Sequence, residues 1–293
     1  MNLRVPSVNL RVRLFAVGLC LAASASTARA QGADTVTVEQ RILMTPDLTP
    51  ADARRRAIDA ALADAVRRVA GVRVQSNALS TLDERGTRLD SRYTSVIALD
   101  AAARAVDYRV TAEEWETRRI DGASQLYLHL TLRAVVEREV GTSDAAFTVE
   151  VSLNAPRFDV RDDVASRNDE IIATVRSSRS AHLALFTIAG DSAQRLFPNA
   201  YLPVATADSG RTSEWPDPEW RERGLRLRAT LPPRVDERRE QLLVVATRGP
   251  VAPPAASLSV MELQRWLVRI PLQDRAMGMA VYDVRRSAAG GRR

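Results

Sequence analysis

The sequence predicts an α+β protein with two domains. The N-terminal domain is expected to pack one long helix on an antiparallel sheet, and the C-terminal domain to be mainly β, sandwich-like, with one helix. Three observations predict this class: one strongly periodic helical segment near the start, two long β segments joined by a turn signal, and many short apolar runs separated by Pro and Gly.

The first thirty residues have the three parts of a secretory signal peptide. Arg4, Arg11 and Arg13 make a positive start, residues 14–25 are apolar, and an Ala-x-Ala pattern ends at Ala30. We therefore expect cleavage after Ala30 and a periplasmic or secreted protein. A bilayer needs about 20 apolar residues, so neither this run nor any later one predicts a transmembrane segment.

Cys20 is the single cysteine of the chain, and it allows two interpretations. A lipid-attachment cysteine follows a small residue, but Leu19 stands before this one. The favoured interpretation is that Cys20 leaves with the signal peptide. The exported chain then has no disulfide, no thiol nucleophile and no cysteine-bound metal.

The net charge of +6 does not indicate a nucleic-acid partner. All 42 basic residues are arginine; without the four of the signal peptide and the four in residues 285–293, 34 arginines stand against 36 acidic residues. The positive charge therefore belongs to the two ends of the chain, and no basic binding surface is predicted. Residues 286–293 are expected to form a disordered tail.

The N-terminal domain is predicted over residues 31–140. It opens with a strand at 35–44, followed by a helix whose N-cap is Thr49, with Pro50 at the first helical position. Apolar residues recur at helical spacing from Ile58 to Val69, and Gly71 ends the helix. A short strand at 72–76 and a weaker helix at 91–99 are expected next.

A long hairpin completes this domain. Its strands are predicted at 103–120 and 124–139, with a turn at 121–124. One face of the second strand is expected to be apolar because its residues alternate. The residues on that face are Leu126, Leu128, Leu130 and Leu132.

The C-terminal domain is predicted over residues 146–285, after a small polar stretch at 139–146. A helix at 257–270, capped by Ser257 or Ser259, interrupts a series of short strands. The strands are expected at 147–153, 170–176, 182–188, 193–197, 225–231, 241–247 and 278–285.

The stretch around Gly190, Asp191 and Ser192 is the first candidate for a catalytic site. Ser192 lies outside a Gly-x-Ser-x-Gly elbow, and the nearest base in sequence, His182, lies at the start of a strand. Gly190 and Asp191 suit a tight turn. We interpret the stretch as a hairpin and expect no catalytic residues.

No set of side chains has the spacing of a metal or cofactor site, so neither a metal nor a cofactor is expected. His129 and His182 lie in different predicted domains and have no ligand partner at i+2 to i+4. Residues 161–170 lack the spacing and central glycine of a calcium loop and are interpreted as a solvated loop; their acidic residues are Asp162, Asp163, Asp169 and Glu170. Glu113, Glu114 and Glu116 are interpreted as the outer face of a strand end.

Trp215 and Trp220 are the candidate partner contacts. They flank two prolines and lie in a stretch that the sequence predicts to be an irregular loop. Paired tryptophans are common at protein and sugar contacts. The alternative is that both rings cover the core of the C-terminal domain.

Two parts of the chain resemble bacterial families. The strand pair that leads to Leu196, Phe197, Pro198 and Asn199, with the later strand ending in "ATRGP", resembles domain of unknown function 4384 over residues 146–285. This resemblance implies export and carries no established catalytic residues.

The helix at 51–72, the strand after it and the long hairpin are similar to the N-terminal domain of flagellar assembly protein T and related surface lipoproteins. That resemblance implies a place in the cell envelope. We therefore expect a non-enzymatic envelope module whose partner is an unidentified envelope protein. The alternative is a carbohydrate- or peptidoglycan-binding protein that uses Trp215 and Trp220 on cell-wall glycan.

Overall fold

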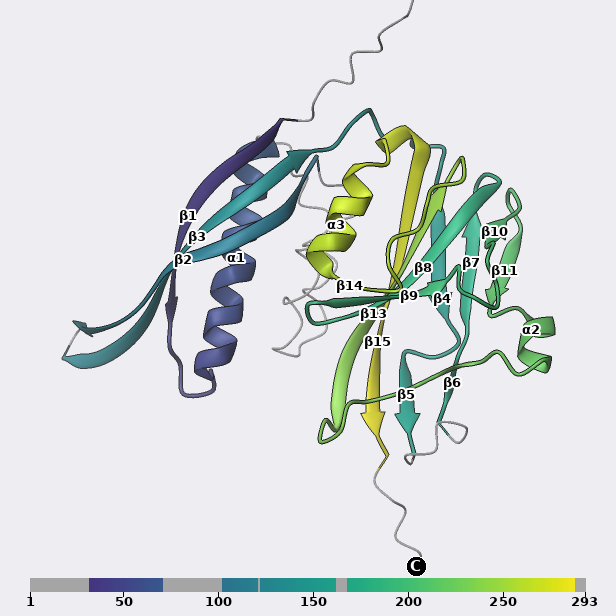
Figure 1. Ribbon diagram of the computed structural model, residues 1–293. Coiled ribbons are helices and arrows are strands. Elements are labelled where there is room, and N and C mark those ends of the chain that lie inside the picture. Colours follow the sequence, from purple (N-terminus) through teal and green to yellow (C-terminus); the bar gives the residue numbers. More distant parts are fainter. Residues whose placement is uncertain (1–31, 71–101, 121, 162–167, 288–293) are drawn as a thin grey trace, which may run out of the picture. The chain divides into compact units, whose positions relative to one another are not determined.

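The computed structural model describes residues 32–70, 102–120, 122–161 and 168–287, all within one compact unit that starts at Gly32 (Figure 1). Within them the fold is α+β and mostly sheet, with three α-helices, which confirms the predicted class. The signal peptide, Gly71, the strand at 72–76, the helix at 91–99 and most of the predicted tail lie outside the described residues. The division into two domains stays a prediction.

The first four elements are β1 (Ala33–Leu43), α1 (Pro50–Ala70), β2 (Ala103–Ile120) and β3 (Ala123–Arg138). The middle of the chain contains β4 (Val149–Leu153), β5 (Arg157–Val160), β6 (Glu170–Ile171), β7 (Ala173–Ser177), β8 (Ala181–Ala189), β9 (Ser192–Phe197), β10 (Thr206–Ala207), β11 (Thr212–Trp215) and α2 (Pro218–Glu222). The last elements are β12 (Leu227–Arg228), β13 (Glu237–Thr247), β14 (Ser257–Ser259), α3 (Val260–Val268), a 3₁₀ turn (Leu272–Asp274) and β15 (Arg275–Arg286). None of the described helices is both long and apolar enough to cross a membrane.

Helix α1 packs on the antiparallel sheet β1–β3–β2. Its start is as predicted: the Thr49 hydroxyl accepts the Asp52 N–H at 3.2 Å. The buried face of α1 recurs every three or four residues and is largely alanine, which lets the helix approach the sheet closely. That face consists of Ala53, Ala57, Ile58, Ala61, Leu62, Ala65 and Val69.

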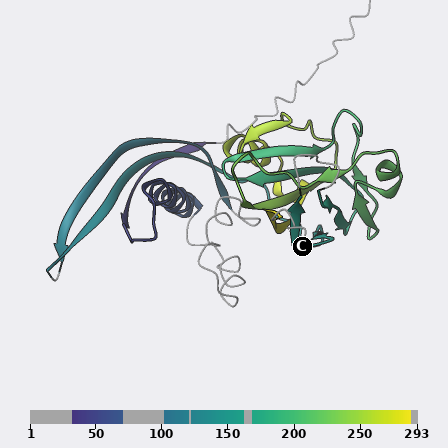
Figure 2. The same ribbon diagram turned by 90° about the horizontal axis from the view of Figure 1, so that it is seen from below.

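The β2–β3 hairpin is confirmed, and it is longer than the third strand of its sheet. β1 ends at Leu43, opposite Tyr127 of β3, so the last residues of the hairpin pair only with each other. Figures 1 and 2 show the hairpin continuing past the end of β1. Leu128 and Leu132 are buried as predicted, whereas Leu126 near the tip is 40% exposed. We call the part of the hairpin from Ala112 to Thr131 the arm.

The remaining strands form a sheet of order β14–β9–β8–β13–β15–β5, with β10 beside β8, together with a sheet β11–β7–β4 and the short pair β12–β6. β13 is apolar from Leu242 to Ala246, where both of its faces are buried. Leu242 and Val244 point into the core shared with β7, while Leu243 and Val245 pack against α3. The predicted hairpin at Gly190 is also confirmed, with this glycine at φ 60° between β8 and β9.

Helix α3 lies where the sequence predicts it, and Ser259 rather than Ser257 is its N-cap. The Ser259 hydroxyl accepts the Glu262 N–H at 3.2 Å, and the Glu262 carboxylate accepts the Ser259 N–H at 2.7 Å. This is a complete capping box. Leu263 and Leu267 on the buried side of α3 pack on the sheet.

Two sequence predictions of local structure are wrong. The stretch from Ser213 to Arg223 is not an irregular loop, because Trp215 ends strand β11 and Trp220 lies in helix α2. Asp217 caps α2 by accepting the Trp220 N–H at 2.9 Å, and Pro218 occupies the first helical position. The predicted strand at 225–231 is reduced to the two residues of β12, which pair with β6.

A buried ionic cluster joins the start of β2 to α3 and β15. The Glu139 carboxylate, just after β3, accepts hydrogen bonds from Arg104 of β2 and from Arg275 of β15, the second at 2.5 Å. Arg104 also donates to the Gln264 side chain at 2.9 Å, and Arg275 to the Ile270 carbonyl at 2.6 Å. The three charged side chains are at most 1% exposed. We call Arg104, Glu139 and Arg275 the buried triad.

Candidate functional site

Ser192 and His182 do not form a catalytic pair. Ser192 begins β9 opposite Ala189, whereas His182 lies at the other end of β8, seven residues away from Ala189. At about 3.4 Å per residue, seven residues correspond to about 24 Å. A proton cannot pass directly between side chains at such a distance. The hairpin interpretation therefore agrees with where these residues lie.

The two histidines lie on different strands, and so do Glu116 and Glu170 of the two acidic stretches. His129 is on the arm, where its Nε2 lies 2.8 Å from Glu116 Oε2, while His182 is on β8. Asp169 accepts the Asp159 N–H at 2.9 Å. Within the described ranges, no group of three or more His, Cys, Asp or Glu residues is arranged to hold a metal ion. Asp162 and Asp163 lie outside those ranges.

The two predicted contact tryptophans have different environments. Trp215 is only 7% exposed, and its ring packs on Phe197 with 5.5 Å between ring centres. Its indole N–H donates to the Ser213 hydroxyl at 3.0 Å. Trp220 is half-buried, and the Arg223 guanidinium lies 5.3 Å from its ring centre. Only Trp220 therefore presents appreciable ring surface to solvent.

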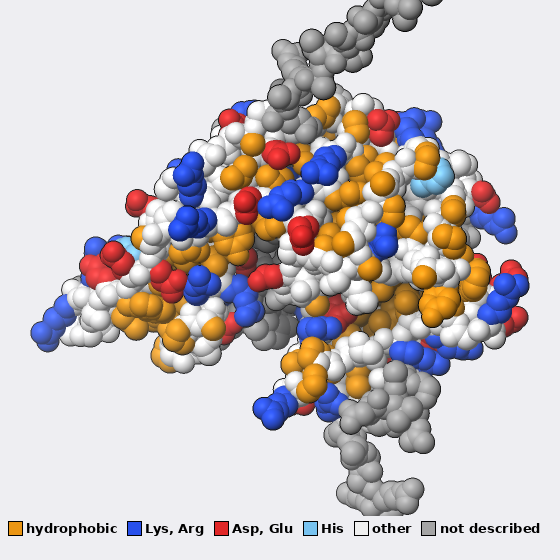
Figure 3. Space-filling model, viewed as in Figure 1, with side chains coloured by type: hydrophobic (Ala, Val, Ile, Leu, Met, Phe, Trp, Pro, Cys, Tyr) orange, Lys and Arg blue, Asp and Glu red, His pale blue; other side chains and the backbone are white. Residues whose placement is uncertain are grey.

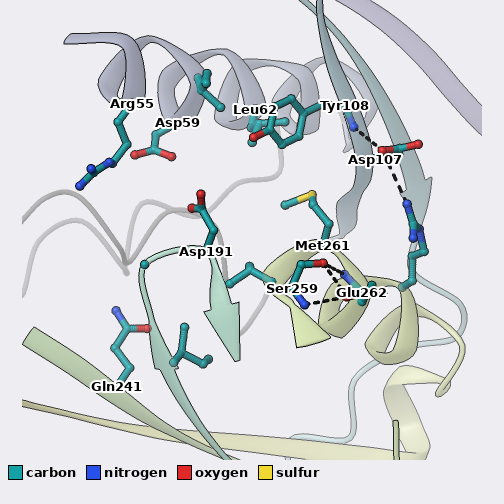
Figure 4. Close-up of a pocket in the computed structure, with 15 residues that line it drawn as sticks. Arg55, Asp59, Leu62, Asp107, Tyr108, Asp191, Gln241, Ser259, Met261 and Glu262 are labelled. Carbon is teal, nitrogen blue, oxygen red and sulfur yellow. Dashed lines mark hydrogen bonds and ion pairs between the residues drawn. The ribbon is translucent and has the colours of Figure 1, made fainter. Parts of the chain in front are cut away.

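A cavity of about 430 Å³ lies among the described residues. It is lined from four places in the chain: α1, β2, the β8–β9 turn and the start of α3, with Gln241 of β13 beside them. Figure 4 shows Arg55 and Asp59 of α1 facing Asp191 of the turn, with Tyr108 of β2 beside α1. Its apolar lining consists of Ile58, Leu62, Ile188, Val260 and Met261.

The polar groups of this cavity carry both signs of charge. Burial, and next the nearby Asp191 carboxylate, raise the pKa of the Tyr108 hydroxyl. Asp107 is 3.6 Å from Arg265 of α3. The Ser259 hydroxyl donates to Glu262 at 2.9 Å as part of the α3 capping box. Ser259 is the one serine among the described lining residues, and its hydroxyl takes part in the α3 capping box.

The described lining of this cavity combines an apolar floor with carboxylates and with Arg55 and Arg265. Such a combination is able to bind a molecule that has both apolar and polar parts. Arg55, Asp59 and Tyr108 carry no sequence signal that marks them as site residues. The turn with Asp191 and the cap Ser259 are predictable from the sequence, but only as local structure.

The arm is the second candidate surface. Trp115 is 42% exposed, and Ile120 and Leu126 are exposed to about the same degree. Charged side chains surround them: Glu116 accepts from Arg118 at 2.6 Å, and acidic and basic groups lie side by side at the end of the arm (Figure 3). By the strand register, Trp115 and Leu126 share one face of the hairpin and Ile120 lies on the other. Exposed apolar side chains with charged neighbours are typical of contact surfaces.

Comparison with known proteins gives no relative for this chain. No protein-family model matches it, and no curated protein matches it. The two family resemblances therefore stay predictions.

Proposed function

We propose that this chain is an exported, non-enzymatic module of the bacterial cell envelope that contacts other proteins through its arm, as an accessory of a periplasmic or cell-surface assembly. Export rests on the signal-peptide pattern that ends at Ala30. The proposal that the module is non-enzymatic is supported by the distance of about 24 Å between His182 and Ser192 along the β8–β9 hairpin.

The observation that carries the contact role is the exposure of Trp115 on β2, the edge strand of the sheet β1–β3–β2. A tryptophan that is 42% exposed leaves apolar surface in water, and covering it with a partner gains hydrophobic free energy. Leu126 lies near it on the adjacent strand and enlarges the apolar surface.

The test is affinity capture from periplasmic extract with three forms of the tagged chain. The wild type is compared with an arm variant, Trp115→Ser with Leu126→Ser, and with a control, Tyr201→Ser, which removes a 72% exposed aromatic elsewhere. Wild type and control should recover the same envelope proteins, and the arm variant should lose them. Recovery of no protein above background, or equal recovery by the arm variant, would contradict the proposal.

Glycan binding through Trp220 is the second candidate. Trp220 stands on α2 with Arg223 over its ring, so one aromatic face and several donors are near the surface. Trp215 is too buried to join it. Peptidoglycan fragments should then co-sediment with the wild type and not with Trp220→Ala. Equal sedimentation of the two forms would exclude this role.

A further inference from the structure

The outer edge of β2 is unpaired in the described part of the chain. The sheet order is β1–β3–β2, so β2 pairs with β3 on one side only. From Ala112 to Ile120 it runs without a bulge, opposite Thr131 to Ala123. The backbone N–H and C=O groups of such an edge are able to pair with another strand.

The charges on these nine residues have opposite signs on the two sides of their middle residue, Glu116. Glu113 and Glu114 precede it, and Arg118 and Arg119 follow it. When two copies of the strand lie antiparallel about a two-fold axis at Glu116, Glu113 meets Arg119 and Glu114 meets Arg118. Each of these pairs occurs twice because of the symmetry. Opposite charges directly across two strands stabilise their pairing.

We propose that residues 112–120 pair antiparallel with the same residues of a second copy, with Glu116 on the two-fold axis. Two three-stranded sheets then join into one six-stranded sheet. This inference goes beyond the proposed function, because it adds a second copy of the chain as a partner for the open edge of β2.

The two Glu116 carboxylates that face each other at the two-fold axis each have partners within their own chain. Glu116 already accepts a hydrogen bond from Arg118 at 2.6 Å and lies 2.8 Å from His129. The Arg118 hydrogen bond lowers the pKa of Glu116, because it stabilises the charged form of that carboxylate.

Other registers bring fewer opposite charges together. An axis at Trp115 places Glu114 opposite Glu116, which is repulsive. An axis at Thr117 places Glu116 opposite Arg118 but leaves Glu114 opposite an isoleucine. Parallel pairing in register places each charge opposite its own copy. The axis at Glu116 is also the one that uses all nine regular residues.

The same register covers the exposed tryptophan. Trp115 lies opposite Thr117 of the second copy and diagonal to the second copy's own Trp115. Diagonal neighbours are about 7–8 Å apart, within reach of aromatic rings. The apolar surface that Trp115 exposes in one chain is therefore covered by the pairing.

Disulfide trapping of the purified full-length chain tests the register. Cys20→Ser first removes the single native cysteine. Glu116→Cys then places two cysteines opposite each other, about 4.5–5.5 Å apart at Cα, within the range for a disulfide. The matched control is Glu114→Cys on the same face, whose copies are offset by four residues, about 14 Å along the strand.

Mild oxidation should give a disulfide-linked dimer for Glu116→Cys, at least about tenfold more than for Glu114→Cys. The double variant Glu114→Cys with Arg118→Cys should restore the cross-link. In the chain without introduced cysteines, sedimentation velocity should show a dimer. Glu114→Arg should weaken this dimer at least about tenfold, because it opposes two arginines at two places, and adding Arg118→Glu should restore it.

A Glu116→Cys yield no greater than that of Glu114→Cys would overturn the proposal, as would a monomer at every concentration tested. A stronger cross-link from Thr117→Cys would overturn the register. These outcomes leave the proposed function to its own test, because capture of other envelope proteins through the arm does not require self-pairing. Conversely, a trapped dimer with no captured protein would support the pairing alone.

Discussion

Glu139→Gln should destabilise the protein strongly although it changes only one carboxylate into an amide. In the buried triad, that carboxylate accepts from both Arg104 and Arg275, whose side chains are 1% exposed. Hydrogen bonds to charged groups contribute about 1.5–3 kcal/mol each. Removing the only carboxylate of the triad also leaves two buried guanidinium charges facing a neutral amide. We therefore expect a loss of about 3–5 kcal/mol in the free energy of unfolding.

The assay is urea unfolding followed by far-UV circular dichroism, with Glu222→Gln as the control. Glu222 is exposed and makes no hydrogen bond or ion pair among the described residues, so the same chemical change there should alter stability by less than about 0.5 kcal/mol. Domains are typically stable by about 5–15 kcal/mol, so the Glu139→Gln midpoint should fall clearly below that of the control. A loss under about 1 kcal/mol would refute the reasoning that the triad is a desolvated ionic cluster.

Three further variants probe the rest of the fold. Gly278→Ala should lower the free energy of unfolding in urea by about 1–3 kcal/mol, because the added Cβ would lie 2.7 Å from a backbone carbonyl of β4. The control, Gly249→Ala, has open space around the added Cβ and should leave stability unchanged. Ser259→Ala removes the α3 cap and should cost about 1 kcal/mol in the same assay; no change would contradict the capping role. The hydrogen bond from the Asp159 N–H lowers the pKa of Asp169 below its ordinary value of 3.8. The charged Asp169 carboxylate therefore stabilises the fold fully above pH 3.8, and this stabilisation is lost as the pH falls through the lowered pKa. Asp169→Asn should therefore flatten the loss of stability in acid, measured by circular dichroism, and an unchanged acid profile would contradict this assignment.

Local elements were predictable because their signals lie within a few residues of each other. Thr49 and Pro50 mark the start of α1, and Gly190 marks the turn between β8 and β9. The mistaken loop at 213–223 came from treating two prolines as interruptions. In the structure, Pro218 starts a helix, a position that needs no backbone N–H from it.

The candidate sites were harder to predict, because their residues are distant in the chain. The cavity joins Arg55, Tyr108 and Asp191, and no periodicity of the sequence relates them. Trp215 and Trp220 are only five residues apart in the sequence, but their environments differ: Trp215 lies in the core, and Trp220 lies half-exposed on α2.

The sequence by itself determined the α+β class, the capped helices and the long hairpin, because hydrogen bonding and side-chain alternation act over one to four residues. Only the tertiary structure decided that Glu139 lies between two buried arginines, that Trp215 is covered, and that β2 has an open edge on the side away from β3. The physical reason is that burial and charge pairing depend on which segments pack together.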